Sequence, residues 1–230
     1  MDIFSKYLKG DRAIWLITLF LGVASLLLVY SSIVTLAYKH SDGNTLRYLV
    51  RHGFFLLSGF GIIYVTHNIK YNYFSRISQV LLFASIPLLA LTLIVGTNIN
   101  DASRWLTIPV INQSFQTSDF AKLALVMYVA RMLSVKQDEI KDFKKAFLPI
   151  FIPVVIVCGL IFPANFSTAA VLFAACLVLM FIGRIPISQL ISLASIGIVF
   201  IVISIGVAKF APALFPRAET WVNRIENFSK

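Results

Sequence analysis

The sequence is poor in the residues that most soluble enzymes use for catalysis. It has two cysteines, three histidines and ten acidic residues among its 230 positions. It also contains no Ser-His-Asp arrangement, no histidine or cysteine cluster with metal-ligand spacing, and no glycine-rich phosphate loop. These absences exclude most of the mechanisms that soluble enzymes use.

What the sequence has instead is long apolar runs. Hydrophobic residues make up 59% of the chain and the mean hydropathy is +0.87, whereas soluble domains are about 45–50% apolar. A bilayer core of about 30 Å needs about 20 helical residues per crossing, so the runs predict membrane-spanning helices. Cys158 and Cys176 both fall inside apolar runs, which favours small buried hydrophobes over a disulfide or a metal ligand.

Seven apolar stretches predict an all-α polytopic membrane protein, with residues 1–230 forming a single incomplete transmembrane domain. The first stretch exceeds the apolar core of about 7–15 residues in a cleavable signal peptide, so we expect it to be retained. Arg51 and His52 are assigned to the first turn of the second span, where long polar side chains reach the interface. The predicted spans cover residues of about 13–37, 48–65, 77–95, 119–133, 146–162, 168–182 and 189–207.

The segments between the spans carry most of the charge. The net charge is +10, but the basic residues lie between apolar blocks and not in one stripe, which indicates membrane topology and no nucleic-acid binding. Basic residues near the early spans favour a cytoplasmic N-terminus. Residues 96–118 are then an outer loop, and an outer segment begins at about residue 208. Residues 134–145 are expected to form a helix on the membrane surface or a solvated extension of the fourth span.

One pair of charges stands at the start of the fourth span. Asp119 is the one acidic residue placed where a helix enters the membrane, and Lys122 is the one lysine within an apolar span. Their i, i+3 spacing puts both on one helix face, and a membrane charge is costly enough that pairing is expected. We expect a bundle-facing ion pair, either a structural clamp or a group that positions an anionic substrate. Ser118 is placed to cap the helix.

The segment before this span also carries polar candidates. Arg104 on the outer side is suited to bind a phosphate or to hold the loop. Trp105 is suited to the aromatic belt at the membrane interface.

Two stretches around these residues resemble a known family. Residues 102–106 (ASRWL) and 115–124 (FQTSDFAKLA) closely resemble the signature ARRWL…FQPSELAKLA of the SEDS family (shape, elongation, division, sporulation). Residues 165–169 (NFSTA) are similar to the family's PDFGTA, and further matches are Tyr30-Ser31-Ser32 and Trp221…Arg224-Ile225…Phe228. The chain is closer to the family's division branch than to its elongation branch.

Three departures from the family pattern matter. Thr117 replaces the usual proline, Asp119 replaces the usual glutamate but keeps its charge, and Ala164-Asn165 replaces Pro-Asp. The last change leaves that turn without a carboxylate, so no catalytic role is assigned to Asn165.

The resemblance implies a peptidoglycan glycosyltransferase that polymerises lipid II, an undecaprenyl-diphosphate-linked disaccharide peptide, outside the bacterial cytoplasmic membrane at the division septum. It implies membrane lipids, a class B penicillin-binding protein and other division proteins as partners. It leaves the cofactor open, and a divalent cation is compatible with it. The rival readings are a lipid II flippase and a non-catalytic scaffold for the penicillin-binding protein.

The resemblance also implies a bundle of ten spans with its catalytic carboxylate in the loop after the seventh span. Neither Glu219 nor Glu226 stands at that position, so we expect no catalytic residue in this chain. The carboxylate is expected beyond Lys230, with this chain an N-terminal part that is inactive alone. The candidates for substrate binding or structural support are Arg104, Trp105, Gln116, Ser118, Asp119, Lys122 and Thr168.

Overall fold

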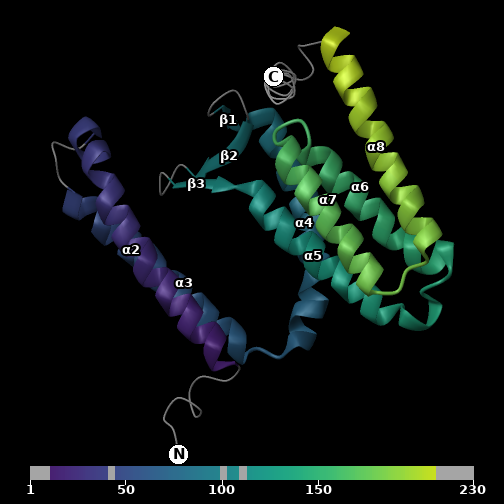
Figure 1. Ribbon diagram of the computed structural model, residues 1–230, viewed down its shortest axis with the longest axis horizontal. Coiled ribbons are helices and arrows are strands. Elements are labelled where there is room, and N and C mark those ends of the chain that lie inside the picture. Colours follow the sequence, from purple (N-terminus) through teal and green to yellow (C-terminus); the bar gives the residue numbers. More distant parts are fainter. Residues whose placement is uncertain (1–10, 41–44, 99–102, 109–112, 211–230) are drawn as a thin grey trace, which may run out of the picture. The chain divides into compact units, whose positions relative to one another are not determined.

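The computed structural model describes residues 11–40, 45–98, 103–108 and 113–210, and within them the chain is mostly helical (Figure 1). Each of the seven predicted spans overlaps one α-helix, so the all-α polytopic class is confirmed. The helices are α2 (Arg12–His40), α3 (Thr45–Asn68), α4 (Tyr71–Val95), α5 (Thr117–Val135), α6 (Leu148–Ile161), α7 (Phe166–Ile182) and α8 (Ile187–Phe210).

Several of these helices are long and apolar enough to cross a bilayer. Within the described residues four stretches meet both conditions: Arg12–Ser32, Thr45–Asn68, Tyr71–Val95 and Phe143–Ile161. Helix α7 and the described start of α8 are equally apolar but shorter. Helix α5 differs because it carries charges within its length, among them Asp119 and Lys122.

The first compact unit, residues 1–73, contains a helical hairpin of α2 and α3. Gly22 allows the two helices to approach, because a Cβ atom there would lie 3.0 Å from the ring of Phe60. Ser25 Oγ lies 2.9 Å from Nε2 of His52, a hydrogen bond that joins the helices. Because α3 begins at Thr45, Arg51 and His52 lie in its second turn, and their assignment to the first turn is wrong.

The second compact unit, residues 74–230, holds the described core of the protein. Helix α5 lies against both α6 and α7, and its Ala121 and Ala124 are fully buried. Small residues of this kind let helix backbones approach closely in membranes. Cys158 and Cys176 are free thiols buried in this core, as the sequence predicts.

The segment between α4 and α5, which the sequence predicts as a long loop, contains regular structure. It forms an antiparallel sheet of β1 (Thr97–Asn98), β2 (Ser103–Ile108) and β3 (Gln113–Gln116), in that order. Trp105 lies opposite Gln116, and Ile108 lies opposite Gln113. The aromatic and β-branched residues of β2 suit a strand, which explains the pairing. The sheet lies at the end of the unit where α5 begins (Figure 1).

The charged segment between α5 and α6 takes neither of its two predicted forms. Helix α5 ends at Val135, a single 3₁₀ turn covers Gln137–Glu139, and a π-helical turn, Phe143–Phe147, leads into α6. A continuous surface helix is excluded because the helical structure breaks at residues 140–142, where Ile140 is buried in the core.

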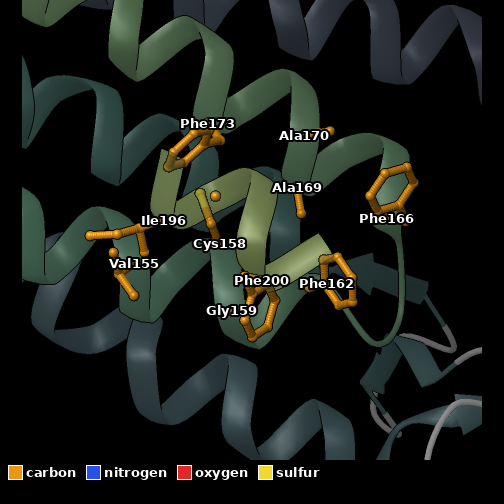
Figure 2. A pocket seen from close by; sticks show the side chains of 11 residues that line it. Val155, Cys158, Gly159, Phe162, Phe166, Ala169, Ala170, Phe173, Ile196 and Phe200 are labelled. Atoms are coloured by element: carbon orange, nitrogen blue, oxygen red, sulfur yellow. The ribbon is translucent and has the colours of Figure 1, made fainter. Parts of the chain in front are cut away.

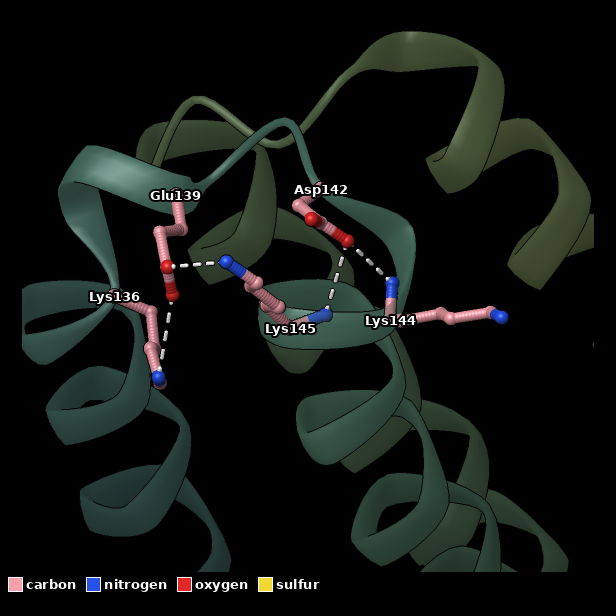
Figure 3. A network of polar contacts seen from close by, with 5 residues as sticks. All are labelled: Lys136, Glu139, Asp142, Lys144 and Lys145. Carbon is pink, nitrogen blue, oxygen red and sulfur yellow. Dashed lines mark hydrogen bonds and ion pairs between the residues drawn. The ribbon is translucent and has the colours of Figure 1, made fainter.

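Two carboxylates hold this segment in shape, as Figure 3 shows. Glu139 accepts hydrogen bonds from Lys145 Nζ at 2.9 Å and from Lys136 Nζ at 3.3 Å. Asp142 accepts from the backbone nitrogens of Lys144 and Lys145 and so caps the turn before α6. These hydrogen bonds favour the ionised carboxylates and hold the pKa of both acids below their ordinary values.

Candidate functional site

A small cavity in the second unit, lined mostly by apolar side chains with a few polar ones, brings together two of the stretches that resemble the family signature. It has a volume of about 20 Å³, room for about one water molecule. We call it the motif pocket. Its polar lining residues are Thr92 of α4, Thr117 and Ser118 of α5, and Asn165 of the turn between α6 and α7. The pocket therefore joins residues 115–124 with residues 165–169.

A hydrogen bond between two buried threonines forms one wall of the motif pocket. Thr92 Oγ1 lies 3.0 Å from Thr117 Oγ1 and 2.7 Å from the carbonyl oxygen of Leu88. Both threonines are 2% exposed. Thr117 stands where the family has proline, so its hydroxyl links α4 to α5 here. Sequence reasoning missed Thr92, because a single threonine in an apolar span has no pattern that marks it.

Ser118 lies inside the first turn of α5 and does not cap it. The helix begins at Thr117, and the residue before it, Gln116, makes no capping hydrogen bond with its side chain. Ser118 Oγ instead accepts a hydrogen bond from Nε2 of Gln116 at 2.9 Å. The capping prediction is wrong because the helix starts two residues earlier than the predicted span. Ser118 nevertheless lines the motif pocket, and Gln116 is its hydrogen-bonded neighbour.

Asn165 has a structural role at the opposite wall. Its Oδ1 accepts a hydrogen bond from the backbone nitrogen of Thr168 at 3.3 Å, so Asn165 caps the N-terminus of α7. Thr168 therefore contributes its backbone N–H group to the site, as the donor to Asn165. An asparagine directly before an apolar run is the signal that the sequence offers for this cap.

Asp119 and Lys122 form the ion pair that their spacing predicts. Lys122 Nζ lies 2.6 Å from Asp119 Oδ1. The side chains of Lys122 and Asp119 are 37% and 57% exposed, so the described helices do not enclose the pair. Asp119 lies in the first turn of α5, where the helix dipole stabilises a negative charge.

Arg104 and Trp105 lie on β2, the central strand of the sheet. Trp105 is half-buried, and its backbone position pairs with Gln116, the residue just before α5. The sheet therefore connects the first motif stretch to the second. The side chain of Arg104 lies outside the described residues, and its phosphate-binding role stays a prediction.

The described pocket offers hydroxyl and amide groups and no carboxylate. Within the described residues no three His, Cys, Asp or Glu side chains gather to hold a metal ion. The groups present can orient a polar ligand by hydrogen bonds, but a general base must remove a proton and needs a pKa suited to that task. The predicted position of that base, beyond Lys230, lies outside the described residues, as do Glu219 and Glu226.

The fold and the site together define a multi-pass helical membrane protein with its polar motifs gathered at one end of its bundle. Residues 11–230 match the cell cycle protein family named for FtsW, RodA and SpoVE. The chain belongs to this family, as the resemblance to the SEDS signature predicted.

Curated relatives carry the name of one member of the family. The chain is 34% identical over 172 residues to a probable peptidoglycan glycosyltransferase FtsW of Trichlorobacter lovleyi, covering 74% of this chain and 44% of the relative. It is 28% identical over 196 residues to the protein of that name from Aliivibrio salmonicida, covering 85% and 48%. The chain thus spans less than half the length of either relative.

Solved structures share the fold. A chain from a peptidoglycan synthase complex superposes with a TM-score of 0.64 and 22% identity, over 97% of this chain and 61% of that one. A crystal structure of the Thermus thermophilus rod shape determining protein RodA gives a TM-score of 0.60 and 24% identity, over 83% and 60%. The chain is therefore a multi-pass bacterial membrane protein.

Proposed function

We propose that this protein is a peptidoglycan glycosyltransferase that polymerises lipid II into glycan strands during cell division. The observation that carries the proposal is the motif pocket, where Ser118 of the stretch 115–124 meets Asn165 of the stretch 165–169, although the two stretches that resemble the family signature are distant in sequence. The relatives named as probable peptidoglycan glycosyltransferases support the reaction class.

In this proposal the described residues hold and orient the lipid II substrate. Ser118 presents a hydroxyl at the pocket, and Gln116 donates a hydrogen bond to it. Lys122, on the same helix as Ser118, supplies a cation that pairs with Asp119. Such groups stabilise a departing pyrophosphate electrostatically. The catalytic carboxylate belongs to a segment beyond the described residues, where the family resemblance predicts it.

The proposal places the N-terminus in the cytoplasm, because the basic segments then lie inside. The segment 134–145 is cytoplasmic in this orientation, and the sheet and the motif pocket face outward, on the side where glycan strands are made. With Cys158 and Cys176 replaced, a single cysteine at Ser114 should react with an impermeant thiol reagent on sealed cells. A single cysteine at Gln137 should not react. Labelling at Gln137 would show that the protein has the opposite orientation in the membrane.

The proposed partner is a class B penicillin-binding protein at the division septum. The peptidoglycan synthase complex that contains a chain of the same fold supports such an assembly. Further helices can pack against two surfaces of the described bundle. One is the part-exposed ion pair of Asp119 and Lys122, and the other is the exposed apolar face of α8.

A reconstitution assay separates this proposal from its two rivals. The full-length protein is placed in liposomes with its transpeptidase partner and fluorescent lipid II. Polymer bands on a gel, absent from a mock purification, support the glycosyltransferase. Movement of lipid II across the bilayer without polymer identifies a flippase, and partner binding without either reaction identifies a scaffold.

A further inference from the structure

The motif pocket has the volume of a single water molecule. It measures about 20 Å³, and a cavity needs about 10–15 Å³ to hold one water. Thr92 and Thr117 in its lining are 2% exposed, and Ser118 is 8% exposed. A ligand at this place is therefore small and is held by buried polar side chains.

Two side chains of the motif pocket carry hydrogen atoms for which the described residues offer no acceptor. The hydroxyl of Ser118 accepts a hydrogen bond from Gln116, but its own hydrogen has no acceptor within the described part of the chain. Asn165 accepts with Oδ1 from the backbone nitrogen of Thr168, and its Nδ2 group has no acceptor among the same residues. Buried donors without acceptors are costly, so a molecule that accepts from both stabilises the pocket.

Thr117 supplies an acceptor for the hydrogens of such a molecule. Its Oγ1 lies 3.0 Å from Thr92 Oγ1, and a hydroxyl oxygen has two lone pairs, so one bond leaves room for a second. Proline, which stands at this position in the signature, has no side-chain oxygen. Water both accepts and donates, and a buried water typically makes about three hydrogen bonds. Ser118, Asn165 and Thr117 provide that number.

A larger space in the same unit lacks these polar groups. The groove between α6, α7 and α8 has a volume of about 130 Å³, and apolar side chains line it, among them Cys158 and Phe173 (Figure 2). An engineered apolar cavity of about 150 Å³ stays dry. The polarity of the lining, and not the volume, therefore decides which of the two spaces holds water.

We propose that the motif pocket binds one structural water molecule that joins α5 to the turn between α6 and α7. The water accepts hydrogen bonds from Ser118 Oγ and Asn165 Nδ2 and donates one to Thr117 Oγ1. It holds the start of α5 against the residue that caps α7. This inference goes beyond the proposed function and does not rest on it.

Radiolytic footprinting in water enriched in heavy oxygen locates a bound water. X-ray pulses convert water to hydroxyl radicals, which oxidise the side chains beside it, and mass spectrometry identifies the labelled positions. The full-length protein is exposed in phospholipid nanodiscs. Leu89 and Ile161 line the motif pocket and are 4% and 2% exposed, so they report a water inside it. Leu82 and Ile150 are equally buried and line neither the pocket nor the groove, so they give the background.

We expect heavy-oxygen label on Leu89 and Ile161 at least fivefold above the label on Leu82 and Ile150, after correction for intrinsic reactivity. Phe173 of the groove should stay at background. Background label on both Leu89 and Ile161 overturns the proposal. Label of equal strength on Phe173 also overturns it, because water would then enter without polar partners.

Variants of the partners test how the water is held. Ser118→Ala removes a donor, and Thr117→Val removes the acceptor with little change in size, so each should lower the pocket label at least threefold. The matched control is Ser85→Ala on α4, because the buried hydroxyl of Ser85 donates to Leu82 of its own helix. It should keep the wild-type label.

Unchanged label in both pocket variants overturns the proposal, and so does an equal loss in the Ser85→Ala control. A variant counts as folded when Leu82 and Ile150 stay at background, because an unfolded chain exposes them to bulk water. The wild-type label decides by itself whether the pocket holds water, so the test stands even where a variant does not fold.

Discussion

The hydrogen bond between Thr92 and Thr117 should be measurable as a coupling between α4 and α5. The two hydroxyls are 3.0 Å apart, and both residues are 2% exposed. Thr92 Oγ1 also lies 2.7 Å from the carbonyl oxygen of Leu88, so its single hydroxyl proton has an alternative acceptor within its own helix. The two substitutions to valine therefore leave different groups behind.

The expected magnitudes follow from what each valine removes. Thr117→Val removes one hydrogen bond but leaves Thr92 bonded to Leu88, so it should cost about 0.5–1.5 kcal/mol. Thr92→Val leaves the buried Thr117 hydroxyl without its described partner and should cost about 1–3 kcal/mol. The double variant removes both hydroxyls, and it should be more stable than the sum predicts by about 0.5–1.5 kcal/mol, since similar cycles in membrane proteins average about 0.6 kcal/mol.

Reversible unfolding in mixed detergent micelles, followed by circular dichroism, gives the four free energies of the cycle. Ser85 provides the control, because its buried hydroxyl donates to Leu82 of its own helix at 2.8 Å. Thr117→Val and Ser85→Ala should be additive within about 0.5 kcal/mol. If the unfolding free-energy changes of Thr92→Val and Thr117→Val were as additive as those of this control pair, the interhelical hydrogen bond would be refuted.

Three further variants test separate features. Gly183→Ala should destabilise the protein by about 1–3 kcal/mol in the same unfolding assay, because its Cβ would lie 2.6 and 2.8 Å from two methyl groups of the buried Leu133; an unchanged midpoint would contradict this packing. Asp119→Asn should lower lipid II turnover, because it leaves the Lys122 ammonium without its carboxylate partner; unchanged turnover would mark the pair as a clamp alone. Glu139, whose pKa is held below its ordinary value of 4.5, stabilises its turn only while it is ionised. Hydrogen exchange of that turn, corrected for intrinsic rates, should rise as the pH falls below 4.5 in the wild type and should depend less on pH in Glu139→Gln, where Asp142 remains as the second titrating carboxylate of the segment; equal profiles would contradict it.

The sequence predicts the helices of this fold well and their ends less well. Apolar runs report burial in lipid directly, so each predicted span overlaps a helix. Helix ends depend on single hydrogen bonds, which is why Ser118 lies within the first turn of α5 and the cap of α7 is Asn165. The sheet before α5 depends on pairing between strands, which hydropathy does not report.

The candidate site divides in the same way. Asp119 and Lys122 could be paired from their helical spacing alone. The meeting of Thr117 with Thr92, and of Ser118 with Asn165 across a pocket, depends on how helices pack and no local pattern encodes it. The family motifs marked most of these residues, but the contact that joins α4 to α5 came from the structure.

The central claim is that the motif pocket serves the polymerisation of lipid II. The most direct test is the steady-state rate of glycan synthesis by the full-length protein with its partner, comparing Ser118→Ala with Ser78→Ala. Both serines are buried, but the described hydrogen bond of Ser78 lies within its own helix, to the carbonyl oxygen of Ser75. The account predicts that Ser118→Ala lowers kcat/KM at least tenfold at unchanged folding while Ser78→Ala keeps the wild-type value. Wild-type kinetics in Ser118→Ala, or equal losses in both variants, would contradict it.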